Sequence, residues 1–137
     1  MKEFLFRAKS IEGRCWVYGD LMQANREKWK IVHKIDSSCD IDSKTVCQYI
    51  FQKDMVDKKI FEGDIVEFYY KPHNQKHRAV VEYDNYLCGW LLNGVKCGVF
   101  KFNYDVPISD CLVIGNIHDN PEFLEEELWI KTKNKLL

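Results

Sequence analysis

Four carboxylates lie close to one glycine in the segment QKDMVDKKIFEGD, residues 52–64, and oxygen-rich sets of this kind can bind Mg²⁺ or Ca²⁺. The four are Asp54, Asp57, Glu62 and Asp64, and the glycine is Gly63. Their spacing does not match a calcium-binding loop, and aspartate and glycine are common in turns in any case. We therefore expect a strand corner at Gly63, which can adopt positive φ, with the carboxylates in water and no bound metal.

Thiols and imidazoles offer a second kind of chemistry. The chain has six cysteines, at positions 15, 39, 47, 88, 97 and 111, and four histidines, at positions 33, 73, 77 and 118. No C-x-x-C or C-x-x-H pair indicates zinc, and no G-x-S-x-G elbow or cysteine-protease signature indicates a nucleophile. A Cys–His pair brought together only by the fold stays open at this point. We expect the cysteines to be structural, no cofactor, and no enzyme, with a metal-dependent enzyme as the second alternative.

Two tyrosines come before the cations Lys71, Lys76 and Arg78 in the segment YYKPHNQKHRAVV, residues 69–81, and its residues 71–76 read as the tip of a hairpin. Basic groups beside aromatic rings can follow a nucleic-acid backbone while a ring stacks on a base. The alternative is an ordinary solvated hairpin tip, because the whole chain is nearly neutral, with 20 basic and 21 acidic side chains. The candidate binding residues are Tyr70, Lys71, His73, Lys76, His77 and Arg78.

An acidic segment near the C-terminus complements this hairpin in charge and could fix the register of an interface. Within one chain the two segments could simply be neighbours; between chains they could build a homo-oligomer. Apolar side chains on the same segment would supply the contact area. The candidate interface residues are Phe123, Leu124, Glu125, Leu128 and Trp129.

The elements that must position these groups are mostly strands. Period-two alternation and β-branched or aromatic runs predict strands at residues 4–8, 16–21, 29–35, 45–51, 65–70, 77–84, 89–92, 97–102 and 111–117. In the strand after Gly63, Val66, Phe68 and Tyr70 should face the core. Residues 36–43 are rich in turn formers and predict an exposed loop, and Asn93–Gly94 predicts a hairpin turn. Asn120 and Pro121 predict the start of a C-terminal helix at about residues 120–133.

Membrane and export signals are not expected. No apolar run approaches the roughly 20 residues that cross a bilayer. The apolar run in MKEFLFRAK is too short for a signal peptide, so we expect a cytoplasmic protein with reduced thiols.

Four blocks carry a resemblance to a known family: FRAKSIEGRCWVYGDL, DSKTVCQYIFQKDMVDKKIFEGDIVEF, VVEYD and VIGNIHDNPEFLEE. In this order they resemble the YopX-like phage and prophage proteins. The resemblance implies a β-rich fold with an SH3-like barrel, and it assigns no catalytic or binding residue. Cys47, Ile50 and Phe51 stand where smaller residues, including glycine, are common in that family, so we do not expect a tight turn there.

The sequence therefore predicts a mainly β chain with a small SH3-like barrel, additional hairpins and a C-terminal α-helix. We expect a single domain over residues 1–137, with the barrel at about 1–118. The function expected is a phage- or prophage-encoded, non-enzymatic binding or assembly module that binds itself or another protein in the host bacterial cytoplasm. The alternative is a nucleic-acid-binding barrel that uses the basic aromatic hairpin.

Overall fold

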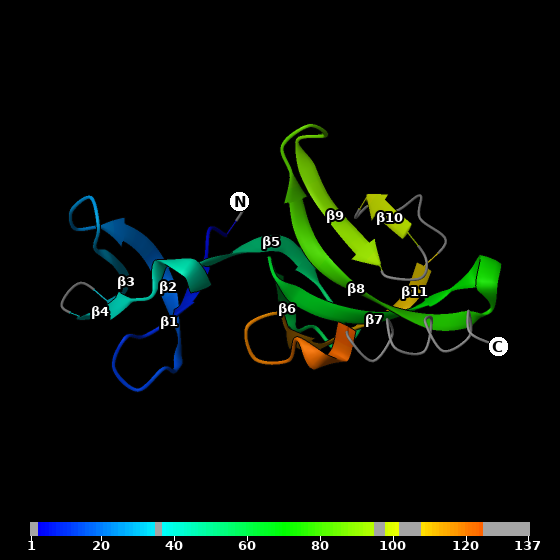
Figure 1. Cartoon of the computed structure of the whole chain (residues 1–137), viewed down its shortest axis with the longest axis horizontal. Helices are drawn as coiled ribbons and strands as arrows, with labels where there is room; N and C mark the ends of the chain where they lie inside the picture. Colours follow the sequence, from blue (N-terminus) through cyan, green and yellow to red (C-terminus); the bar gives the residue numbers. More distant parts are fainter. Residues whose placement is uncertain (1–2, 35–36, 95–97, 102–107, 125–137) are drawn as a thin grey trace. The chain divides into compact units, whose positions relative to one another are not determined.

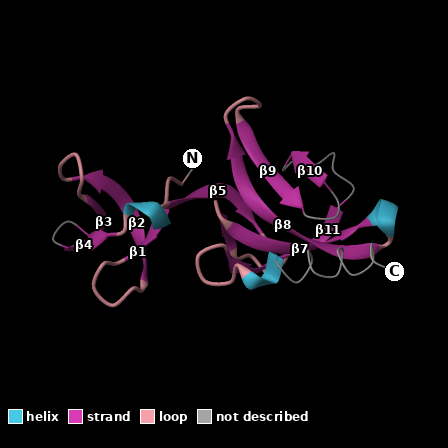
Figure 2. Cartoon of the chain, in the orientation of Figure 1, coloured by secondary structure: helices cyan, strands magenta, loops and turns pink. Residues whose placement is uncertain are grey.

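The computed structural model describes residues 3–34, 37–94, 98–101 and 108–124. Antiparallel strands make up most of them (Figure 2), so the mainly β class is confirmed. The chain divides into two compact units, the N-terminal unit Met1–Phe51 and the C-terminal unit Gln52–Leu137. Their described strands form open sheets, and the predicted SH3-like barrel is not confirmed. Whether both units fold together as one domain stays a prediction.

The N-terminal unit consists mainly of strands, in which successive side chains point to opposite faces of the sheet. Its strands are β1 (Phe6–Lys9), β2 (Trp16–Gln23), β3 (Trp29–Lys34), β4 (Ser37–Ile41) and the start of β5 (Cys47–Lys53), hydrogen-bonded in the order β4-β3-β2-β1-β5. One face buries Ala8, Ile31 and Ile41 in a small core. A 3-10 turn, η1 (Ser43–Thr45), connects β4 to β5 and is capped by the side chain of Asp42.

Strand β4 corrects the prediction of an exposed loop at residues 36–43. Its residues SSCDI have turn-forming types, but they pair with β3 from Trp29↔Ile41 to Lys34↔Ser37. Backbone pairing with a well-formed neighbour outweighs the local preference of serine and aspartate for turns. The correction places Cys39 on a strand.

Phe51 occupies the conformation that a glycine would favour. Its φ is 66°, a left-handed value that costs an L-residue about 1–2 kcal/mol. The ring contacts Phe4 at 5.4 Å and Tyr49 at 5.7 Å between centroids. These aromatic contacts offset part of the strain in β5.

The C-terminal unit holds a five-stranded sheet. After the short strand β6 (Lys59–Phe61) come β7 (Asp64–Tyr70), β8 (Gln75–Asp84), β9 (Gly89–Gly94), β10 (Gly98–Lys101) and β11 (Ile108–Asn116). They pair antiparallel in the order β10-β9-β8-β7-β11 (Figure 1). A 3-10 turn, η2 (Lys71–His73), joins β7 to β8. The predicted turn at Asn93–Gly94 is wrong, because both residues lie in β9 and pair with β10.

The corner at Gly63 is confirmed, with φ 82°. Its amide donates to the Val81 carbonyl at 2.8 Å, and its carbonyl accepts from the Ile117 amide at 2.9 Å. Asp64 is only 1% exposed, and its Oδ2 accepts from the Phe61 amide at 2.8 Å. The expectation that this carboxylate faces water is therefore wrong. It is buried and stabilises the turn by accepting a hydrogen bond from a backbone amide.

Strand β7 is covered on both faces where it leaves the corner. Val66 and Phe68 are fully buried, as predicted, whereas Tyr70 is only half-buried. Ile65, which alternation places on the opposite face from Val66 and Phe68, is fully buried as well. Alternation in the sequence shows which residues share a face of a strand. It does not show whether the rest of the protein buries both faces.

The C-terminal helix is described only at its start. Residues 122–124 are helical, and the Phe123 amide donates to the Asn120 carbonyl at 3.1 Å. The remainder of the predicted helix over 120–133 lies outside the described residues. Before it, the Asn116 side-chain oxygen accepts from the amides of His118 and Asp119, which shapes the corner after β11.

Candidate binding surfaces

The predicted binding hairpin lies where β7 and β8 meet, and its register splits the candidate residues between two faces. Phe68 pairs with His77 and Tyr70 with Gln75, while Tyr69 pairs with Lys76. Directly opposed residues share a face of the sheet, and adjacent pairs alternate. His77 and the two cations Lys76 and Arg78 therefore lie on opposite faces.

On the first face, Tyr70, His73 and His77 form a compact cluster. His73 Nδ1 lies 2.9 Å from His77 Nε2, and the Tyr70 ring packs against both imidazoles, at 4.7 and 5.8 Å between centroids. In this hydrogen bond one imidazole donates and the other accepts. His77 is 1% exposed, so the pair anchors the turn η2 to the sheet. Within residues 3–34, 37–94, 98–101 and 108–124, no group of three metal-ligating side chains occurs.

On the second face, Glu67 lies between the two cations of β8. Its carboxylate is 3.4 Å from Arg78 Nε and 3.9 Å from Lys76 Nζ. Arg78 also donates to the Phe123 carbonyl at 3.1 Å and lies over the Phe123 ring at 5.4 Å. Arg78, one of the three cations that the nucleic-acid alternative assigns to phosphate, is thus engaged within the chain. Of the six candidates, Lys71, His73 and Lys76 are exposed.

The predicted interface is described only in part. Phe123 and Leu124 are half-buried, and the contact with Arg78 shows that the hairpin and the helix start are neighbours within one chain. Glu125, Leu128 and Trp129 lie outside the described residues.

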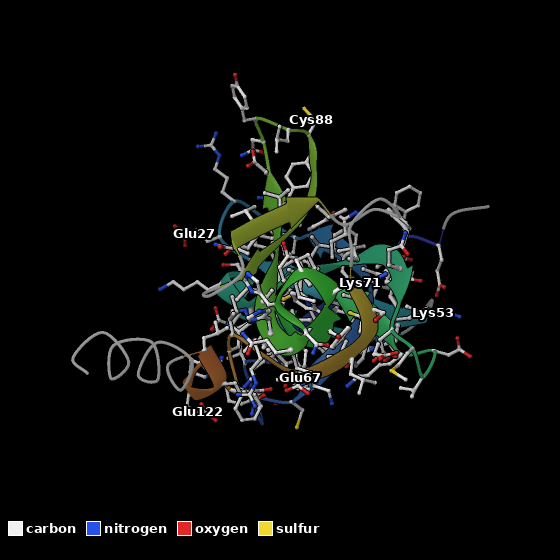
Figure 3. The ribbon with its side chains drawn as sticks, turned by 90° about the vertical axis from the view of Figure 1, so that its right-hand side faces the viewer. Glu27, Lys53, Glu67, Lys71, Cys88 and Glu122 are labelled. Carbon is white, nitrogen blue, oxygen red and sulfur yellow. The ribbon has the colours of Figure 1, made fainter. Side chains whose placement is uncertain are left out.

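The tip of the β8–β9 hairpin is an apolar surface that the sequence reasoning missed. Tyr86 is 93% exposed, Leu87 46% and Tyr83 45%, and the Tyr83 and Trp90 rings contact at 5.1 Å. Cys88 marks this tip at the top of Figure 3, and Lys71 and Glu67 lie lower. The signal was available, because YDNYLCGW places turn formers between aromatic residues.

Carboxylates of the hairpin stabilise it by accepting hydrogen bonds. Asp84 Oδ1 accepts from the amides of Tyr86 at 2.7 Å and Leu87 at 3.1 Å. Glu82 accepts from the Asn93 side chain at 3.2 Å. Local side-chain to backbone bonds of this kind preorganise a turn. The tip therefore presents its rings on an ordered loop.

The acidic set around Gly63 has a structural role. Asp54 Oδ1 accepts from the amides of Val56 at 3.0 Å and Lys58 at 2.9 Å, and its Oδ2 accepts from Val113 at 3.0 Å. Desolvation raises the pKa of Asp54, but these hydrogen bonds and the charge of Lys58 outweigh it and leave the pKa below its ordinary value. Burial raises the pKa of Glu62. Asp54 is only 6% exposed, so the expectation that the carboxylates face water is wrong for Asp54 as well as for Asp64.

Comparison with known protein families gives a match. A family model described as YopX protein matches residues 5–125, which is most of the chain. No curated protein matches the sequence. In the part of the chain that the structure describes, no helix has the length and apolar character to cross a bilayer.

Proposed function

Because the chain belongs to the YopX family, we propose that it is a phage- or prophage-encoded binding or assembly module without enzymatic activity, which works in the cytoplasm of the host bacterium. Its partner is a protein surface, either a second copy of the chain or another protein. The observation that supports this proposal is the exposed aromatic tip of the β8–β9 hairpin.

The tip has the chemistry of a protein-binding anchor. Tyrosine, tryptophan and leucine together offer apolar area, and tyrosine and tryptophan are enriched among the residues that dominate binding energies. Burying exposed apolar area stabilises a complex by about 25 cal/mol per Å² before the costs of association. The turn is already ordered by Asp84, so its rings lose less freedom on binding.

Charge around the tip favours protein over nucleic acid. No lysine or arginine occurs from residue 79 to residue 95. Phosphate recognition needs cations beside the stacking rings. The nucleic-acid alternative rests on the other end of β8, where Lys71 and Lys76 are exposed beside Tyr69 and Tyr70, and where Glu67 reduces the positive potential.

The test removes the apolar anchor and keeps the turn. The double variant Tyr86→Ser/Leu87→Ser retains both backbone amides that bind Asp84, and Val56→Ser is the matched control, since Val56 is a 67% exposed apolar residue in another turn. Light scattering of the purified chain and pull-downs from lysogenic cells are compared for the three proteins. An oligomer or a bound protein that the double variant loses and the control keeps supports the proposal. Binding that is identical in all three proteins overturns it.

Two finer structural expectations belong to the same proposal. We propose that the sheet of the C-terminal unit forms part of an SH3-like barrel and that a helix extends over residues 120–133. Backbone assignment by NMR tests both: helical carbon shifts to residue 133 and cross-strand contacts that close the barrel are expected, and extended shifts or an open sheet edge would contradict them.

A further inference from the structure

A cysteine and a histidine face each other in the N-terminal unit. Ile31 of β3 pairs with Cys39 of β4, and His33 follows Ile31 by two residues, which puts all three on one face of the hairpin. The register shift after Val32 leaves His33 beside Cys39. His33 Nε2 lies 3.4 Å from Cys39 Sγ.

The neighbouring strand fixes the tautomer of the imidazole. His33 Nδ1 lies 2.9 Å from the carbonyl oxygen of Tyr18 in β2. A carbonyl oxygen only accepts, so Nδ1 carries the hydrogen, and the lone pair of Nε2 faces the thiol. The Cys39 thiol therefore donates to Nε2. A nucleophile, a base within reach and a third group that orients the base are the elements of an activated thiol.

A hollow lies next to Cys39. Cys39 is half-buried and lines a hollow of about 420 Å³ together with Ser10, Ile11 and Val17. The salt bridge between Lys30 and Asp40, at 3.0 Å, is part of the same lining. A small molecule with polar groups fits a hollow of this size and composition.

The other described cysteines differ from Cys39. Cys15 and Cys88 are exposed, and their thiols donate to the carbonyls of Gly13 and Asn85. Cys47 is 2% exposed. Desolvation, and then the charge of Asp54, raise the pKa of Cys111 to about 11. Among the cysteines that the structure describes, Cys39 is the one whose sulfur faces an imidazole nitrogen.

We propose that Cys39 and His33 form a modification site for small disulfides of the glutathione class. His33 Nε2 takes the thiol proton as the Cys39 sulfur attacks one sulfur of the disulfide. The S–S bond of the reagent breaks, a mixed disulfide forms on Cys39, and the leaving thiolate takes the proton from His33. One disulfide and one thiol enter, and one disulfide and one thiol leave. The site is independent of the proposed binding tip, which lies in the other unit.

The test measures the rate at which each cysteine reacts with oxidised glutathione, by peptide mapping and mass spectrometry. At pH 7 we expect Cys39 to react about tenfold faster than Cys15 and Cys88, because an unassisted thiol is only a few per cent thiolate. His33→Gln should slow Cys39 about tenfold and leave the rates of Cys15 and Cys88 unchanged. Equal rates for Cys39 with and without His33 would overturn the proposal.

Two further measurements distinguish a change in the reactivity of the Cys39 thiol from a loss of the folded structure. Buried Cys47 reports on the fold, since it reacts only when the N-terminal unit opens. In the wild-type protein, the ratio of the Cys39 rate to the Cys15 rate should be larger at pH 7 than at pH 9, because the advantage of a thiol assisted by a base shrinks as the pH approaches the ordinary pKa of a cysteine. A ratio that does not change with pH counts against His33 as the proton acceptor, even if the variant misfolds.

Discussion

Replacing Asp54 by asparagine tests the account of the acidic turn most directly. Asparagine keeps one oxygen, which can still accept from the amides of Val56 and Lys58. Its amide group, however, replaces the oxygen that accepts from Val113 and presents a donor to a donor. A buried N–H left without an acceptor costs about 1–3 kcal/mol, so we expect Asp54→Asn to lower the free energy of unfolding by about 2 kcal/mol.

The assay is urea unfolding followed by circular dichroism, with Asp57→Asn as the matched control. Asp57 is exposed in the same turn, so its variant removes the same charge without removing these hydrogen bonds. We expect the control to stay within about 0.5 kcal/mol of the wild-type protein. Equal free energies of unfolding for the two variants would refute the structural role of Asp54.

The pH dependence of the free energy of unfolding is a second test of the role of Asp54. The folded-state pKa of Asp54 is lowered, so its stabilisation is present above the ordinary aspartate pKa, about 3.9, and is lost as the pH falls through the folded-state value. The gap in stability between wild-type protein and Asp54→Asn should therefore narrow below about pH 4. A gap that is constant down to pH 2.5 would contradict the assignment.

Three other substitutions probe the corners and the cation face. Gly63→Ala should cost about 1–2 kcal/mol in urea unfolding, because alanine is strained at φ 82°; an unchanged midpoint would refute this. Gly115→Ala should cost about 1–3 kcal/mol, since its Cβ would lie 2.5 Å from the Asn120 side-chain oxygen; a shift below 0.5 kcal/mol, roughly a surface effect, would show that Asn120 moves freely. Glu67→Gln should change stability by less than about 1 kcal/mol and strengthen low-salt binding of single-stranded DNA in electrophoretic titration; unchanged binding would exclude this face as a nucleic-acid site.

Local rules predicted much of the fold. The Gly63 corner and the strands on either side of the β7–β8 turn followed from turn chemistry and alternation. Strand β4 was missed because SSCDI has turn-forming residues, and only its pairing with β3 makes it a strand. Burial of Asp64 was missed because a carboxylate is ordinarily solvated unless the fold supplies a donor, here the Phe61 amide.

The candidate sites were also predicted only in part from the sequence. The hairpin was located correctly, but His77 faces the opposite way from Lys76 and Arg78, which follows from register and not from composition. The His33–Cys39 pair depends on β4 and on a register shift, so no sequence spacing indicates it. The β8–β9 tip was within reach of the sequence, since its aromatic residues flank turn formers.

The position of β11 has a consequence for synthesis of the protein. This strand leaves the ribosome last among the described strands, yet it pairs with β7, which is made well before it. Until β11 arrives, β7 has an open edge, Asp54 lacks the Val113 amide, and the Gly63 carbonyl lacks its donor from Ile117. Nascent or truncated chains that end before residue 108 should therefore need chaperones and should aggregate without them.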